Sequence, residues 1–180
     1  GHIFSPQDLI SFGTAQGASF PPGASWEYSN TNYVVAALVI EAVSGIPYET
    51  FIQNNILNPL GLSNSYFPTT DTLPGSFMGS FFDINQSPPK EDFTYLDPSG
   101  SFGAGPLASK LPDMIQWLEA LMEGQVLSPA SQSELLTFVN ASWPNIVYGL
   151  GIGEYDNGSF TAVGHTGAVF NSSNMQYVNG

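Results

Sequence analysis

The chain has 180 residues and a strongly unbalanced charge: 15 acidic residues, two lysines and no arginine give a formal net charge of −13. This balance excludes phosphate recognition by a basic patch, so we expect no nucleic-acid partner, and it excludes an arginine clamp on a carboxylate within the chain. The lack of cysteine excludes disulfides, thiolate nucleophiles and cysteine-ligated zinc. With only His2 and His165, a metal site built from several histidines is not expected either.

At this length about 70% of the unfolded surface can be buried, so the chain can form one domain with a core. The hydrophobic fraction of 42% indicates a globular protein. The longest apolar run, Val34–Ile40, is much shorter than the roughly 18 residues that cross a bilayer, so we predict no transmembrane segment. The acidity has two interpretations, solubility or an acidic or salt-rich habitat, and the first is the more general.

Helices are predicted for the first part of the chain. The run Ser5–Asp8 is a typical helix start, because the serine caps the helix and a proline fits its first turn, and this helix is predicted to reach about Phe12. The next helix begins near Asn30 or Thr31 and ends at Gly45, a typical C-cap. Its apolar residues at helical spacing predict one buried face, formed by Val35, Leu38, Val39 and Ala42.

A third helix is predicted from Pro47 to the Asn58-Pro59 pair, which stops it. Residues 63–103 then show no regular period, and we interpret them as an irregular excursion with short strands rather than a separate domain. The acidic residues of this stretch lack the spacing of an EF-hand, so a calcium site is the weaker interpretation of Asp83, Glu91, Asp92 and Asp97.

Two further helices are predicted between residues 112 and 138. The first begins at Pro112, ends at Gly124 and is amphipathic, with an inward face of Met114, Ile115, Trp117, Leu118 and Leu121. The second begins at Ser128-Pro129 and continues through Phe138.

The pattern changes to strands after residue 145. Val147–Tyr155 is glycine-rich and extended, Asp156–Gly158 is a hairpin signal, Ser159–Val163 is the return strand, and Asn174–Val178 can form one more strand. Helices followed by antiparallel strands favour an α+β fold. Since a lone hairpin needs further strands or helices, we expect residues 1–180 to be one partial domain, incomplete at both ends, with a mainly helical region at 1–145 and an incomplete sheet at 146–180.

Tyr28 and Asn30 are the first candidate site residues, because they stand where a loop becomes a helix and catalytic groups concentrate on such loops. The phenol of Tyr28 can act as a general base if a neighbouring cation lowers its pKa from about 10. The structural alternative is an aromatic side chain packed at the helix entry, with Asn30 as the N-cap. Asn30 can also do both, starting the helix and offering its amide to a substrate.

His165, Thr166 and Gly167 form the second candidate, because they follow a predicted strand. A strand edge presents free backbone N–H groups, which suit an extended substrate or an oxyanion, and Gly167 lets the backbone come close to a ligand. The alternative is a strand end that leads into a turn. A lone histidine with no acidic neighbour in sequence is not a catalytic triad by itself.

Several collinear segments carry a family resemblance. They are the run from Pro22 to Tyr33, the Pro59–Leu62 turn, residues 104–124, Tyr148–Ile152 and Gly164–Gly167. Together they resemble the penicillin-recognising serine hydrolases, a β-lactamase-like superfamily that includes D-alanyl-D-alanine carboxypeptidases, class C β-lactamases, esterases and D-peptidases. The first run resembles the second motif of this family, and the last resembles its third. The resemblance implies a β-lactamase/transpeptidase-like fold, nearest to the carboxypeptidase branch at residues 4–41.

The resemblance also implies a serine nucleophile in a Ser-x-x-Lys motif upstream of Tyr28, and no such motif precedes Tyr28 here. The formal match Ser87–Lys90 is rejected, because it follows the second motif and Pro89 prevents the helix that would put serine and lysine on one face. Lys110 has Leu107, not serine, three residues before it. Two explanations stay open: a fragment of a longer hydrolase, which the pattern favours, or a divergent member that has lost its nucleophile.

By resemblance, Tyr28 would assist the lysine in taking the proton from the serine, and Asn30 would bind the amide carbonyl of the substrate. His165 and Thr166 would line the cleft and favour a carboxylate. Gly167 would allow close approach, and the backbone N–H of Ala168 would donate to the oxyanion. The implied mechanism is acylation followed by hydrolysis, without metal or cofactor.

The function implied by the resemblance is acyl hydrolysis of small D-amino-acid peptides, β-lactams or esters, in an extracellular, periplasmic or cell-envelope location. The remaining N- and C-terminal parts of the same fold are the expected partners. Two other hypotheses stay open: a catalytically inactive module that binds or senses a ligand, and a purely structural domain. The fold alone does not name the substrate.

Overall fold

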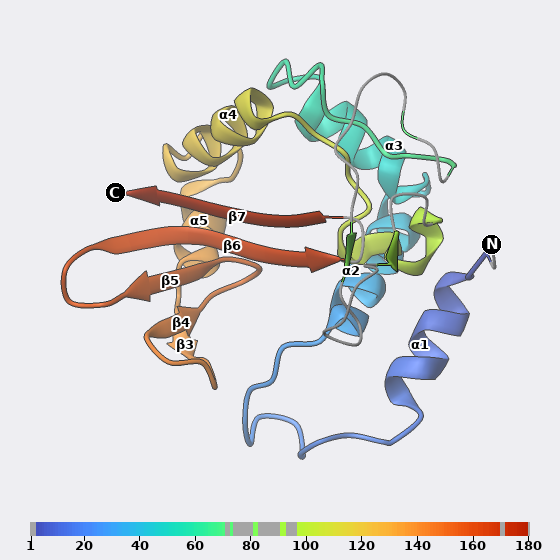
Figure 1. The fold of residues 1–180 in the computed structure, drawn as a ribbon, viewed down its shortest axis with the longest axis horizontal. Coiled ribbons are helices and arrows are strands. Elements are labelled where there is room, and N and C mark those ends of the chain that lie inside the picture. Colours follow the sequence, from blue (N-terminus) through green and yellow to red (C-terminus); the bar gives the residue numbers. More distant parts are fainter. Residues whose placement is uncertain are drawn as a thin grey trace.

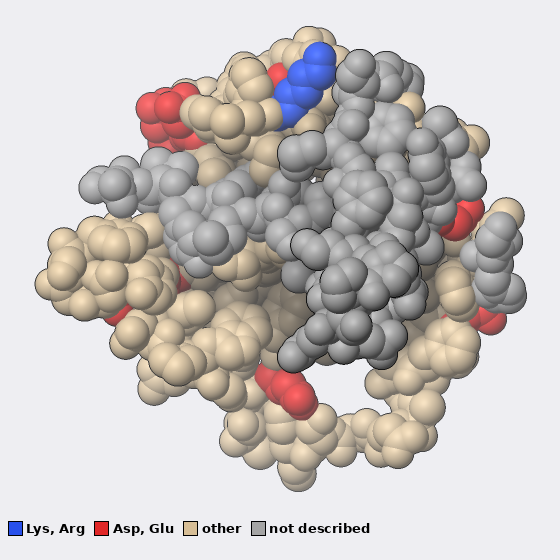
Figure 2. Space-filling view, viewed as in Figure 1, with Lys and Arg blue, Asp and Glu red and all other residues tan. Residues whose placement is uncertain are grey.

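The structure, a computed structural model, describes residues 3–70, 73, 81–82, 91–92, 97–169 and 172–179. Asp83 and the Ser87–Lys90 run lie outside these residues. Helices come first and an antiparallel sheet follows, which confirms the predicted α+β class (Figure 1). Acidic side chains are spread over the face shown in Figure 2, whereas lysine atoms occur there at one place among the described residues.

The first two helices begin and end close to the predicted residues. α1 covers Pro6–Thr14 and starts with a capping box, in which the backbone N–H of Asp8 donates to Ser5 Oγ (3.2 Å) and the Ser5 N–H donates to the Asp8 carboxylate (2.8 Å). α2 covers Asn30–Ser44, and its N-cap is Ser29 rather than Asn30. It ends at Gly45, whose φ of 74° is the left-handed conformation that glycine adopts freely.

The buried face of α2 differs from the predicted face. Val34 and Ala37 are the buried residues of this helix, and Gly103 lies so close to it that a β-carbon there would lie 2.6 Å from Ala37 Cβ. The predicted inward residues are instead exposed or half-buried: Val35, Leu38, Val39 and Ala42. Because every residue of Val34–Ile40 is apolar, the periodicity could not select the face; contacts with distant parts of the chain, such as the approach of Gly103 to Ala37, decide it.

α3 (Tyr48–Ile52) continues directly into a π-helical segment, η1 (Gln53–Leu57), and the pair ends at Asn58 as predicted. The hydroxyl of buried Tyr48 donates to the carbonyl oxygen of Phe102 (3.0 Å), which ties this pair to the later part of the chain. No single described helix is long and apolar enough to cross a membrane; α2 and α3–η1 reach that length and composition only as a pair, bent by 77°.

The middle of the described chain is irregular, with short strands, as predicted. β1 (Phe81–Phe82) pairs antiparallel with β2 (Glu91–Asp92), and two short 3-10 helices follow, η2 (Pro98–Gly100) and η3 (Phe102–Ala104). Asp97 caps η2 by accepting a hydrogen bond from the backbone N–H of Ser99 (2.9 Å). Hydrogen bonds from Ser99 lower the pKa of Asp97, so this carboxylate has a local structural role.

α4 covers Leu111–Met122 and α5 covers Pro129–Leu135. Leu118 and Leu121 are buried, as predicted, whereas Ile115 is 46% exposed, so the predicted inward face of α4 was wrong at that residue. α5 ends earlier than the predicted end at Phe138, because the chain leaves the helix there and enters the first strand of the sheet.

A charged hydrogen-bond network fastens the start of α4 to the loop after η1. Asp113 is only 5% exposed, and its carboxylate accepts from the backbone N–H (2.8 Å) and side-chain amide (3.1 Å) of Asn64 and from Ser65 Oγ (2.9 Å). Ser109 Oγ lies 2.7 Å from Ser65 Oγ. Burial raises the pKa of Asp113, but these hydrogen bonds and nearby Lys110 outweigh it, so the pKa lies below its usual range. We call Asn64, Ser65, Ser109 and Asp113 the Asp113 network.

The main sheet has the order β3-β4-β5-β6-β7 among the described residues, and each strand is antiparallel to the next. The strands are β3 (Val139–Asn140), β4 (Ile146–Tyr148), β5 (Gly153–Asp156), β6 (Thr161–Val169) and β7 (Ser172–Asn179). One prediction was wrong here. The segment predicted as extended, Val147–Tyr155, is the hairpin β4–β5, closed by a hydrogen bond from Gly149 N to Ile152 O (2.8 Å). β3 follows the last predicted helix directly.

β6 is longer than the predicted return strand Ser159–Val163. Residues 161–164 pair with β5, whereas residues 162–169 pair with β7. Residues 165–169 therefore have β7 on one side and no described strand on the other. The carbonyl of Leu135, the last residue of α5, accepts from the N–H of Leu150 in the turn between β4 and β5 (3.1 Å).

Candidate active site

The junction between loop and α2 holds Tyr28 and Asn30 together. Ser29 has extended backbone, and its Oγ accepts from the N–H of Thr31 (3.3 Å), which starts the helix at Asn30. The Tyr28 hydroxyl donates to Asn30 Oδ1 (3.0 Å). Asn30 is exposed, and its amide nitrogen has no hydrogen-bond partner among the described residues, so it can donate to the carbonyl of a ligand.

The phenol of Tyr28 is protonated in this environment. Burial raises its pKa, and the neighbouring Tyr33 hydroxyl raises it further. A general base needs the opposite shift, which a nearby cation would cause. Proton abstraction by Tyr28 would therefore need a nearby cation that lowers this pKa.

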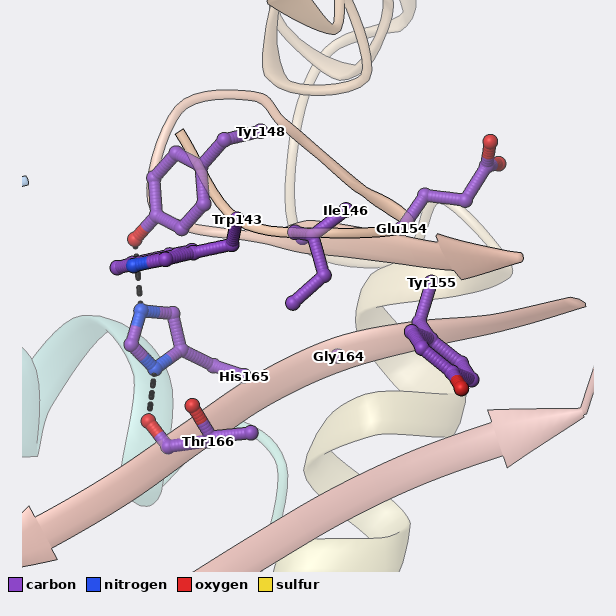
Figure 3. A pocket seen from close by; sticks show the side chains of 9 residues that line it. Trp143, Ile146, Tyr148, Glu154, Tyr155, Gly164, His165 and Thr166 are labelled. Carbon is purple, nitrogen blue, oxygen red and sulfur yellow. Dashed lines mark hydrogen bonds between the residues drawn. The ribbon is translucent and has the colours of Figure 1, made fainter. Parts of the chain in front are cut away.

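His165 lies on β6, half-buried, with both ring nitrogens hydrogen-bonded (Figure 3). Nε2 lies 2.6 Å from the hydroxyl of Tyr148 on β4, and Nδ1 lies 2.5 Å from the carbonyl oxygen of Thr166. The Tyr148 hydroxyl also forms a hydrogen bond with the hydroxyl of Tyr33 on α2. We call Tyr33, Tyr148, His165 and the Thr166 carbonyl the tyrosine–histidine network; it joins α2 to two strands of the sheet.

Aromatic rings surround this network. The ring centroid of Tyr28 lies 5.5 Å from that of Tyr33 and 5.8 Å from that of His165. Trp143 and Trp26 complete the group, with centroids 5.5 Å apart. Ring contacts of this kind add to the free energy of apolar burial, so they hold the loop before α2 against the sheet and bring the two predicted motifs together.

Thr166, Gly167 and Ala168 lie in the part of β6 beyond the end of β5. Thr166 and Gly167 are exposed. Because only β7 pairs with this part among the described strands, the other edge presents backbone groups that can bind an extended ligand. The position fits the predicted role of the Ala168 N–H as an oxyanion donor, and that role stays a prediction.

The recess beside His165 is too small to hold a substrate. Its volume is about 30 Å³, the space of roughly one water molecule. It is lined by residues of β4, β5 and β6 together with Trp143 (Figure 3). Glu154, in the same recess, points away from His165 (Figure 3), so the imidazole has an aromatic rather than an acidic surrounding.

The contacts of the described residues at this site involve hydrogen-bond donors and aromatic rings. No group of three His, Cys, Asp or Glu side chains in the described part of the chain could hold a metal ion. The hydrogen bonds of Tyr28 and His165 go to Asn30, Tyr148 and the Thr166 backbone, and none goes to a described serine hydroxyl. The arrangement can bind and orient a carbonyl compound, and acyl transfer needs a further group.

The structure places Tyr28, Asn30 and His165 near one another, and the sequence analysis did not name their aromatic partners Tyr33 and Tyr148 as site residues. Tyr148 precedes a glycine-rich turn and Tyr33 stands in the first turn of α2, positions where tyrosine is usually a packing residue. The signal that could have found them is the density of hydroxyl-bearing rings next to each motif. Their mutual hydrogen bond spans 115 residues of sequence, which no local pattern reveals.

Comparisons with known proteins agree on one family. A family model described as Beta-lactamase matches residues 2–179. A Bacillus subtilis (strain 168) protein, PbpX, whose name places it among the penicillin-binding proteins, is 32% identical over 168 residues, which are 87% of this chain and 41% of PbpX.

Two solved structures are similar over nearly all of the chain. A D-stereospecific amidohydrolase from Streptomyces sp. matches with a TM-score of 0.91 and 32% identity, covering 98% of this chain and 53% of that one. The D-amino acid amidase from Ochrobactrum anthropi SV3, complexed with D-phenylalanine, matches with a TM-score of 0.80 and 27% identity, covering 93% and 51%. This chain therefore spans about half the length of these two proteins and 41% of PbpX.

Proposed function

Because the chain belongs to the β-lactamase family of serine hydrolases, we propose that it supplies the substrate-orienting part of the active site of a serine acyl hydrolase. The observation that carries the proposal is the meeting of Tyr28, Asn30 and His165, with the rings of Tyr28 and His165 5.8 Å apart. Since the chain spans about half the length of its relatives, the serine and lysine of a Ser-x-x-Lys motif would come from the rest of the intact protein.

We propose amides and peptides of D-amino acids as substrates, ahead of β-lactams and esters. The names of two similar structures, a D-stereospecific amidohydrolase and a D-amino acid amidase, support this class. The charge distribution favours a neutral amide over a free carboxylate, because the described lysine, Lys110, interacts with Asp113 at the start of α4. A location in the cell envelope or outside the cell stays a prediction.

In the proposed reaction the serine hydroxyl attacks the carbonyl carbon of the substrate, while the lysine, assisted by Tyr28, takes its proton. The amide nitrogen of Asn30 donates to the carbonyl of the acyl group, and the Ala168 N–H donates to the developing oxyanion. The C–N bond breaks and the amine leaves with the transferred proton. Water then attacks the acyl-enzyme and releases the D-amino acid and the free serine.

The outer face of α2 supports the proposal that further segments of the same fold cover this chain. Val35, Val39 and Val43 are 44%, 54% and 83% exposed and recur every fourth residue, so they form one apolar stripe. Such a stripe is stabilised when it packs on another element. In the intact protein Val39→Asp should then lower the free energy of unfolding by about 2 kcal/mol; a change below about 0.5 kcal/mol, as at a solvated surface, would refute this packing.

The main test uses the intact protein with D- and L-phenylalanine amide and a fluorophosphonate probe. We expect hydrolysis of the D-amide, covalent labelling of a serine by the probe, and loss of both in a variant of that serine to alanine. Reversible binding of D-phenylalanine without labelling and without hydrolysis would refute the hydrolase proposal. That result would support the alternative, a ligand-binding module that keeps the cleft without the nucleophile.

A further inference from the structure

The directions of the hydrogen bonds in the tyrosine–histidine network follow from which atoms can donate. The carbonyl oxygen of Thr166 can only accept, so Nδ1 of His165 carries a proton. In a neutral imidazole the other nitrogen then has a lone pair and accepts. Nε2 therefore accepts the hydroxyl proton of Tyr148.

Tyr148 is suited to this donor role. Its side chain is only 6% exposed, and burial raises the pKa of its hydroxyl, so the phenol keeps its proton. That single proton goes to His165, and the Tyr148 oxygen then accepts from the hydroxyl of Tyr33. The donors point in one direction from Tyr33 to the Thr166 carbonyl.

The surroundings of His165 favour the neutral ring. The hydrogen bonds of its ring go to a phenol and a backbone carbonyl, and no described carboxylate takes part. The rings of Tyr28 and Tyr148 have centroids 5.8 Å and 5.7 Å from the imidazole, and Glu154 points away (Figure 3). A neutral ring needs one partner that accepts and one that donates, and the Thr166 carbonyl and the Tyr148 hydroxyl are these two partners.

We propose that Tyr148 is a positioning residue that holds His165 as a neutral Nδ1–H imidazole, so that neither ring nitrogen is available to a substrate. The tautomer stands on the contacts alone; its consequence for catalysis rests on the proposed function. His165 then fixes the Thr166 carbonyl and the adjoining free edge of β6 beside Tyr28, and it neither transfers a proton nor binds a carboxylate. This differs from the carboxylate-favouring role that the family resemblance implies for His165.

The experiment is ¹⁵N NMR of the intact protein labelled at histidine, with His165 assigned by its loss in His165→Gln. In the unchanged protein at neutral pH we expect a protonated Nδ1 and an unprotonated, hydrogen-bonded Nε2. In Tyr148→Phe the ring and its packing remain but the donor is lost, so the Nε2 resonance should move toward that of a free unprotonated nitrogen. Tyr33→Phe should move it in the same direction by less, because it only weakens the polarisation of Tyr148.

Tyr66→Phe is the matched control: Tyr66 pairs through its backbone with Ala108, away from the network, and its variant should leave both nitrogen resonances unchanged. A protonated Nε2 in the unchanged protein, as in the other tautomer or in the imidazolium, would overturn the proposal. So would an Nε2 resonance that Tyr148→Phe does not move.

An activity measurement separates this inference from the proposed function. If the intact protein hydrolyses D-amides, Tyr148→Phe should lower kcat about tenfold with KM within about twofold, as expected when orientation rather than binding is lost. A protein that gives the expected NMR signals but no hydrolysis would refute the proposed function and keep the tautomer. Hydrolysis together with a protonated Nε2 would support the proposed function and refute the tautomer.

Discussion

The Asp113 network and the tyrosine–histidine network use similar numbers of polar groups for different purposes. In the first, a carboxylate is 5% exposed and accepts hydrogen bonds from Asn64 and Ser65. The second carries no formal charge in the proposed tautomer, and it lies beside the exposed groups of Asn30 and Thr166.

This difference in charge and exposure distinguishes a network that stabilises the fold from a network that belongs to the candidate active site. A buried charge must be satisfied completely, because each missing partner costs free energy, and the Asp113 network accordingly closes on itself between a loop and α4. The polar groups of the tyrosine–histidine network are also hydrogen-bonded to one another. Beside this network, however, there are hydrogen-bond donors that have no partner among the described residues. The free amide nitrogen of Asn30 is the clearest of these donors.

The largest expected effect is a loss of activity with little loss of stability. In the intact protein Tyr28→Phe should lower kcat for a D-amide by about 100-fold or more, because the hydroxyl that assists proton transfer is removed. The hydrogen bond lost, to exposed Asn30, is worth little stability, so the Tm should fall by less than about 2 °C. Steady-state kinetics and a thermal melt check both; a kcat within threefold of the original would contradict the assigned role.

At the Asp113 network we expect the reverse, a loss of stability with little loss of activity. Asp113→Ala leaves the donors of Asn64 and Ser65 without an acceptor, so the Tm should fall by about 5–10 °C. At a temperature well below the melt, kcat should stay within about twofold. Asp8→Ala, which removes the carboxylate of an exposed capping box, is the matched control with a smaller loss; equal losses would show that burial of Asp113 contributes nothing.

A pH titration should distinguish the charged from the neutral network. The pKa of Asp113 is lowered in the folded protein, so its stabilisation is complete above the unfolded pKa of about 3.9 and is lost as the pH falls through the lower folded value. Urea midpoints of the original protein should therefore fall more steeply below about pH 4 than those of Asp113→Asn. Tyr148→Phe should have the same pH dependence as the original protein in this range. If the urea midpoints of Asp113→Asn fell in parallel with those of the original protein, the lowered pKa assigned to Asp113 would be refuted.

The smallest effect is expected at the far end of the tyrosine–histidine network. Tyr33→Phe leaves the Tyr148–His165 hydrogen bond in place and removes only the group that polarises it. We expect a decrease in kcat of about two- to threefold, measured beside Tyr148→Phe in the same assay. A larger decrease for Tyr33→Phe than for Tyr148→Phe would reverse the inferred direction of the network.

Local signals predicted where elements begin, and tertiary contacts decided which faces they bury. The Ser5–Asp8 capping box and the Gly45 C-cap were read correctly, because their physics lies within a few residues. The buried face of α2 was not, since Val34–Ile40 is apolar throughout and the contacts that bury Val34 and Ala37, such as the approach of Gly103 to Ala37, come from distant parts of the chain.

The sheet and the site follow the same rule. The sequence pattern predicts one extended segment for Tyr148 and the glycines after it. In the structure Gly151 has a φ of 84° and turns the chain between β4 and β5. Tyr28, Asn30 and His165 were predicted together because each belongs to a recognisable motif. Tyr33 and Tyr148 belong to the same site through a contact between distant parts of the sequence, and only the folded chain reveals it.

The free edge of β6 beyond Gly164 has a stereochemical consequence. A ligand strand that pairs with residues 165–169 would have its direction and register set by backbone hydrogen bonds. With the backbone held, inverting one α-carbon exchanges the side chain with the α-hydrogen, so the side chain no longer stands perpendicular to the sheet but points along it toward the neighbouring strand. The edge would thereby sort mirror-image amino acids by where their side chains fall, although no single contact measures handedness.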